Sequence, residues 1–154
     1  MKQAIKHKSV LWLVLLPAIA LTFLPSCKKG EDDPFLSFRS RKARVVAEWT
    51  LTGYSFNGSS QNMTTTTKYN FKKDGTGEKT ISAGSISTTT KFRWDFLGGN
   101  GDYKKKERLV VYESDGIYAD VYDIVMLKNK EMKLHTESKN GNNIDKEDYT
   151  LEVK

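Results

Sequence analysis

The segment Lys68-Tyr69-Asn70-Phe71-Lys72-Lys73-Asp74-Gly75 carries the two signals that decide the fold. Its first half alternates polar with aromatic residues, and a period of two is typical of a strand with one face on a core and the other in water. Its second half ends in Asp-Gly, a pair that tolerates the positive φ of a tight hairpin turn. The segment therefore predicts an antiparallel strand that leads directly into a hairpin.

Both signals recur along the chain after Arg44. The alternation returns in residues 92–96, 132–134 and 149–153. The seven turn signals are Asn57-Gly58, Asp74-Gly75, Ala83-Gly84, Gly98-Gly99-Asn100-Gly101, Asp115-Gly116, Asn129 and Asn140-Gly141. Seven turns predict eight strands that are joined as consecutive hairpins.

Eight sequential strands leave two unpaired edges in an open sheet, and closure into a barrel removes both edges. No proline follows Pro34, so nothing in the sequence interrupts a ladder of backbone hydrogen bonds. We therefore predict an all-β protein, an eight-stranded antiparallel up-and-down β-barrel.

Residues 37–48 predict one short N-terminal helix ahead of the barrel. Ser37 is the expected N-cap, and four residues fall near helical spacing, namely Phe38, Lys42, Val45 and Trp49. We expect this helix to plug or flank one mouth of the barrel, with the first strand beginning near Trp49.

The N-terminal residues are typical of an export signal. A basic start is followed by the apolar block 10–24, which is fifteen residues long and contains Pro17. A membrane-spanning helix needs about 20 apolar residues, so a cleaved signal fits the block better. One form of cleaved signal is a plain secretory signal, with cleavage near Ser26. The alternative is a lipoprotein signal.

Leu24-Pro25-Ser26-Cys27 resembles a bacterial lipobox, and Cys27 is the one cysteine of the chain. We predict a lipoprotein signal peptide at residues 1–26 and lipidation of Cys27 through its sulfur and its amine. Stable anchoring takes more than one acyl chain, which a triacylated cysteine supplies. The predicted partner is therefore a membrane, and the predicted location is the cell envelope, on the outer membrane.

Residues 27–36 are charged and contain Gly and Pro, which predicts a lipidated, solvated tether before a domain at residues 37–154. A lysine before an acidic cluster resembles the export tag of surface-displayed lipoproteins of the Bacteroidetes. The alternative is a generic polar spacer.

The net charge does not indicate a nucleic-acid partner. The signal segment holds three of the 25 basic residues and no acid, so 22 basic residues against 19 acids leave a charge of +3. The one basic cluster, residues 104–108, is either a solvated strand face or a contact for acidic glycans or lipid headgroups.

Four segments resemble the lipocalin-like domains of Bacteroidetes lipoproteins: residues 47–54, 69–77, 122–127 and 131–134. The resemblance extends over about Val45 to Lys154. It implies a calycin-type barrel with Trp49 as a plug and a small apolar cavity that is open at one end. The family shares no catalytic residues, so the resemblance assigns none to this chain.

The residue inventory argues against an enzyme. His135 is the only histidine after the signal segment, and Cys27 is consumed by lipid, which excludes a histidine metal cluster and a Cys/His pair. No serine lies in a nucleophile elbow, and residues 98–101 lack the Lys-Ser/Thr ending of a phosphate loop. We expect no catalytic residue, metal or cofactor.

The candidate lumen or ligand residues share faces of alternating segments: Tyr69, Phe71, Phe92, Trp94, Phe96, Tyr118, Asp120 and Tyr122. Asp120 or Asp123 either points into the barrel, where Arg93, Arg108 or the polar head of a ligand would balance its charge, or is turned outward.

Two functions fit these observations. The barrel either binds a small hydrophobic or amphipathic ligand, or it is an interaction module that binds a macromolecule through its rim loops, as an accessory subunit of a surface complex or an enzyme inhibitor. An eight-stranded barrel is filled by side chains or holds one small ligand. A cavity of about 300 Å³ or more would favour the carrier. The side chains expected to decide this are Phe71, Phe92, Trp94, Phe96, Leu134 and Leu151.

Overall fold

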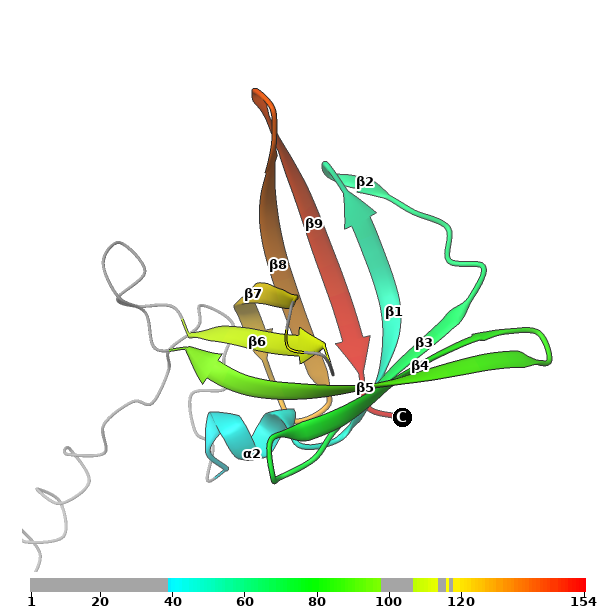
Figure 1. The fold of residues 1–154 in the computed structure, drawn as a ribbon, viewed down its shortest axis with the longest axis vertical. Helices are drawn as coiled ribbons and strands as arrows, with labels where there is room; N and C mark the ends of the chain where they lie inside the picture. Colours follow the sequence, from blue (N-terminus) through cyan, green and yellow to red (C-terminus); the bar gives the residue numbers. More distant parts are fainter. Residues whose placement is uncertain (1–38, 98–106, 114–115, 117) are drawn as a thin grey trace, which may run out of the picture.

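The structure is a computed structural model that describes residues 39–97, 107–113, 116 and 118–154. In these residues one short helix precedes a series of strands (Figure 1). The elements are α2 (Arg41–Val45), β1 (Glu48–Phe56), β2 (Ser59–Ser60), β3 (Thr66–Phe71), β4 (Thr76–Ala83), β5 (Ile86–Leu97), β6 (Arg108–Glu113), β7 (Ala119–Leu127), β8 (Glu131–Asn140) and β9 (Asn143–Glu152). The predicted signal peptide, Cys27 and the tether lie outside the described residues.

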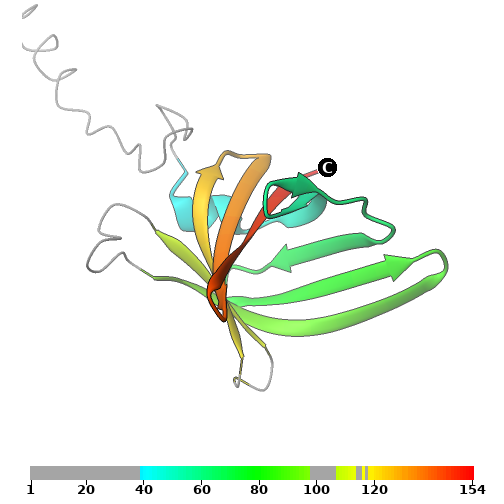
Figure 2. The same ribbon diagram turned by 90° about the horizontal axis from the view of Figure 1, so that it is seen from above.

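The sheet closes on itself. From β3 to β9 each strand pairs antiparallel with the next, and β1 pairs with both β3 and β9. The two-residue strand β2 pairs only with the far end of β1, at Ser55 and Phe56. Eight strands therefore form the closed barrel, which confirms the predicted fold class. Figure 2 shows β3, β4 and β5 splayed away from β8.

The segment that predicted a hairpin forms one, between β3 and β4. Gly75 has φ 83°, and the Asp74 carboxylate accepts hydrogen bonds from the Thr76 backbone N–H and hydroxyl. The Trp94 indole N–H lies within hydrogen-bond distance of two backbone carbonyls of this turn, those of Lys72 and Thr76, at 3.1 and 3.0 Å. The turn is thus fixed from within by its own residues and from the side by β5.

The helix is shorter than predicted. It spans Arg41–Val45, and Ser40 is its N-cap, accepting from the Ala43 N–H at 3.2 Å. The expected cap, Ser37, lies outside the described residues. The backbone is already extended at Val46, and the ladder of β1 begins at Glu48, so pairing with β3 overrides the helical spacing there.

One end of the barrel is filled with apolar side chains. Trp49 and Val45 are fully buried, and the Trp49 indole N–H donates to the Val45 carbonyl at 2.8 Å, which ties β1 to α2. The Arg44 guanidinium donates to the carbonyl of Leu127 at the end of β7. The core consists of Val45, Trp49, Phe71, Phe92, Trp94, Leu109, Ile124, Leu127, Met132, Leu134 and Leu151.

Candidate functional site

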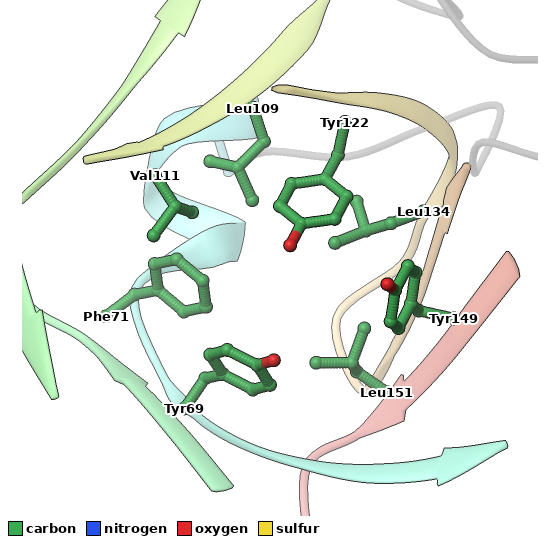
Figure 3. A pocket seen from close by; sticks show the side chains of 8 residues that line it. All are labelled: Tyr69, Phe71, Leu109, Val111, Tyr122, Leu134, Tyr149 and Leu151. Carbon is green, nitrogen blue, oxygen red and sulfur yellow. The ribbon is translucent and has the colours of Figure 1, made fainter. Parts of the chain in front are cut away.

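A pocket lies in the lumen above this core (Figure 3). Its lining comes from β3, β6, β7, β8 and β9: Tyr69, Phe71, Leu109, Val111, Tyr122, Leu134, Tyr149 and Leu151. The cavity volume is about 10 Å³, which is close to the smallest space that holds one water molecule. The enclosed part of the lumen is therefore water-sized.

The lining forms two layers, because residues two apart on a strand point to the same face. The floor is apolar and buried, and consists of Phe71, Leu109, Leu134 and Leu151. The upper layer is half-buried and consists of Tyr69, Val111, Tyr122 and Tyr149. The pocket thus changes from apolar at its floor to phenolic at its opening.

Tyr54 adds a fourth tyrosine to the mouth through a β-bulge. The register of β1 against β9 shifts between Leu51 and Gly53, so Tyr54 pairs with Tyr149 on the inner face. The rings of Tyr54 and Tyr149 lie 5.2 Å apart, and the rings of Tyr122 and Tyr149 meet edge to face at 5.5 Å. Three aromatic rings therefore form one continuous wall.

Two carboxylates lie beside the hydroxyls of this wall. Tyr149 donates its hydroxyl hydrogen to Glu147, which is two residues away on the same face of β9. Asp120 lies two residues before Tyr122 on the same face of β7, close enough to act on its hydroxyl. In Figure 3 the hydroxyl oxygens of Tyr69, Tyr122 and Tyr149 are directed toward the middle of the pocket.

The surroundings keep these phenols protonated. Burial raises the pKa of Tyr122, and the negative charge of Asp120 raises it further. The pKa of Tyr149 is raised by burial and then by its hydrogen bond to Glu147. Tyr54 also has a raised pKa, from burial and the charge of Glu147. At neutral pH the wall therefore consists of neutral hydroxyls with carboxylates beside them.

The predicted lumen residues separate into groups. Tyr69, Phe71 and Tyr122 line the pocket. Phe92 and Trp94 are buried in the wall beside it, where their rings lie 5.2 and 5.5 Å from that of Phe71.

The remaining predictions lie nearer the edges. Phe96 is half-buried and packs on Trp94 with ring centroids 6.0 Å apart. Tyr118 is 67% exposed, so its side chain is not enclosed by the lumen. Asp120 pairs across the ladder with the pocket residue Val111, which places it on the inner face, and its side chain is exposed at the mouth.

Sequence reasoning missed Tyr54, Val111, Tyr149 and Glu147 as mouth residues. Tyr149 begins an alternating segment that ends in the core, so the same period could have found Tyr149 and then Glu147. Tyr54 could not be found in this way, because the bulge reverses the alternation of β1.

His135 lies on the outer surface, near a serine and an aspartate. The Asp148 carboxylate contacts the His135 Nδ1 at 2.7 Å and accepts from the Ser55 hydroxyl at 3.1 Å. In a Ser-His-Asp relay the serine contacts the histidine instead. Here the carboxylate lies between the two, so His135 is not placed to take the proton of Ser55.

The His135 site predicts a small pH dependence of stability. Partial burial lowers the pKa of His135, but hydrogen bonds to Asp148 and Glu137 outweigh it, and the net direction is upward. The histidine therefore stabilises the fold below its unfolded pKa of about 6.5, and the contribution is lost as pH rises through the folded value. Both acids are about half exposed, which limits the effect to about 1 kcal/mol.

Urea unfolding of the unmodified protein should show a loss of stability from about pH 6 to 8, and His135→Gln should lack this loss. Equal pH profiles of the two proteins would contradict the prediction.

Neither a metal-binding cluster nor a membrane-spanning helix occurs in the described ranges. These ranges contain no group of three or more His, Cys, Asp or Glu side chains that could hold a metal ion. In the same part of the chain, no helix combines the length and the apolar character needed to cross a membrane.

Fold and pocket together define a small closed antiparallel barrel, compatible with a lipocalin-like binding module. No protein-family model matches the chain, and no curated protein matches it.

Proposed function

We propose that this chain is a non-enzymatic, lipid-anchored binding protein of the bacterial cell envelope, which holds one end of a small amphipathic ligand in the mouth of its barrel. The observation that carries the proposal is the tyrosine-lined pocket above a filled core. Ligand sites are typically concave and mostly apolar, with a few convergent polar groups. Four tyrosines over an apolar floor fit that description.

The size of the cavity restricts what is bound. An enclosed volume of about 10 Å³ is far below the roughly 300 Å³ of a typical ligand pocket. A ligand therefore inserts one small group and leaves most of its body at the rim. Engulfment of a whole hydrophobic molecule is not favoured by this lumen.

The filled core also favours the second candidate, an interaction module. Trp49, Leu127, Met132 and Leu151 are almost completely buried, so side chains fill the closed end of the lumen. A macromolecular partner would then contact the rim and insert one side chain into the same pocket. The partner would be a subunit of a surface complex or an enzyme that the protein inhibits.

A bulky side chain at Val111 tests the binding site. Val111 lines the pocket, whereas Val121 is exposed on the outer face of β7. We expect a small molecule to co-purify with the full-length protein from its host membranes, detected by native mass spectrometry. Val111→Phe should abolish its retention and Val121→Phe should preserve it.

If the protein purified from native membranes holds no small molecule, and Val111→Phe releases a bound protein partner, the interaction module is supported. Retention of the same molecule by both variants would refute binding in the pocket.

The anchor is tested by Cys27→Ser. Without the thiol no acyl chain can be attached through sulfur, and a single chain gives only marginal membrane binding. We expect the variant to move from the membrane pellet to the supernatant after a carbonate wash, with an unchanged circular dichroism spectrum. A variant that stays in the pellet would show that lipidation is not the anchor.

A further inference from the structure

Two hydroxyls of the mouth pocket, those of Tyr122 and Tyr149, are left as hydrogen-bond acceptors. A tyrosine hydroxyl has one proton to donate and two lone pairs that accept. Tyr149 gives its proton to Glu147, and the Tyr122 hydroxyl lies beside the carboxylate of Asp120. A carboxylate without a proton can only accept hydrogen bonds. What these two hydroxyls offer to a ligand is therefore lone pairs. A ligand that carries N–H donors would satisfy them, whereas a carboxylate or phosphate would not.

The negative charge around the pocket also favours a ligand that is a cation. The carboxylates of Asp120 and Glu147 lie on the inner face, next to tyrosine rings. Among the described residues, Lys79 is the one cation that lies on this inner face near Tyr69. It pairs with Tyr69 across the ladder of β3 and β4, and its Nζ lies 5.6 Å from the Tyr69 ring centroid. Aromatic faces attract cations. The position of Lys79 shows that Tyr69, a tyrosine of the pocket lining, already accommodates an ammonium group.

The volume of the pocket selects among cations. A space of about 10 Å³ admits one group the size of a water molecule. A primary ammonium group has about that size and carries three N–H donors. A trimethylammonium group is larger and has no donor, so it would neither enter nor satisfy the hydroxyl lone pairs.

We infer that the mouth pocket binds the primary ammonium end of an alkyl chain, with its N–H groups on the Tyr122 and Tyr149 hydroxyls and its charge beside Asp120 and Glu147. The inference rests on the proposed function, since it names the chemistry of the ligand at the same site. A free alkylamine and the lysine side chain of a partner present the same group.

Isothermal titration calorimetry on the full-length chain in nonionic detergent tests the inference with four hexyl probes. Hexylamine should bind at least about tenfold more tightly than hexanol or hexyltrimethylammonium, and hexanoate should give no measurable heat. Nα-acetyl-lysine amide separates the sources: affinity equal to that of hexylamine points to a partner's lysine, and much weaker affinity points to a free amine.

Variants locate the binding. Asp120→Asn combined with Glu147→Gln removes both charges at nearly constant shape and should lower the affinity for hexylamine about tenfold. Lys79→Gln removes the resident ammonium group and should raise that affinity about threefold. Asp95→Asn is the matched control, because Asp95 is exposed and pairs with Lys42 at 3.4 Å outside the pocket.

Two results would overturn the inference in distinguishable ways. If hexanol or hexanoate binds as tightly as hexylamine, and Val111→Phe abolishes that binding, the pocket binds ligands but does not select ammonium. If no probe binds the unmodified chain, the inference fails, and retention of a molecule from native membranes decides the proposed function separately.

Discussion

Trp49→Ala is expected to lower the free energy of unfolding by about 3–5 kcal/mol, the range for a large aromatic residue truncated in a core. The Trp49 side chain is fully buried, and its indole N–H donates to the Val45 carbonyl. Truncation would leave a cavity between α2 and the barrel floor and an unsatisfied carbonyl. Small domains have only about 5–15 kcal/mol in total, so we expect a large shift of the urea midpoint.

Trp49→Phe separates packing from the hydrogen bond. It keeps most of the buried area and loses the N–H donor, so its cost should be clearly smaller than that of Trp49→Ala. Urea unfolding followed by circular dichroism measures both variants. A loss below about 1 kcal/mol for Trp49→Ala, as typical of surface positions, would contradict the closed end described above.

The second large effect is expected at Gly77. A Cβ atom there would lie 2.2 Å from the Phe92 ring and 2.8 Å from the Asn70 carbonyl oxygen, closer than real contacts allow. The ring cannot simply turn away, because Phe92 is buried and packs on Phe71. Gly77→Ala should therefore cost about 3 kcal/mol, the upper end of the range for an overpacked core.

A matched control is Gly53→Ala. Gly53 is also a strand glycine, but its added Cβ would meet Thr150 at 3.3 Å, a contact that a shift of a few tenths of an ångström relieves. The cost of Gly77→Ala should also fall in a Phe92→Leu background, because a smaller side chain gives way. Equal unfolding free energies for Gly77→Ala and Gly53→Ala would show that Phe92 does not lie over Gly77.

Much of the fold could be predicted because its signals are local. The Asp74-Gly75 turn and the alternation around it have the predicted structure, and strand pairing closes the barrel as the edge argument requires. The helix boundaries could not be predicted with the same accuracy. Spacing of apolar residues extends the helix to Glu48, but the competing ladder of β1 with β3 begins there.

The candidate site was predicted less completely, because it depends on register rather than on composition. Alternation identified Tyr69, Phe71 and Tyr122. It could not place Tyr54, whose inward position depends on a bulge, since a shift of one residue exchanges the two faces of a strand. Nor could it show that Tyr118, two residues from Asp120, lies beyond the enclosed part of the lumen.

The proposed ligand binds among the tyrosines of the mouth, and fluorine NMR can detect this binding. Fluorotyrosine incorporated into the full-length chain gives a fluorine resonance for each tyrosine, and an extract of the host envelope provides the ligand. We predict that the extract shifts the resonances of Tyr54, Tyr69, Tyr122 and Tyr149, while Tyr112, which faces outward beside the pocket residue Val111, stays unchanged. Shifts at Tyr112 with the four mouth resonances unmoved would contradict binding in the mouth pocket.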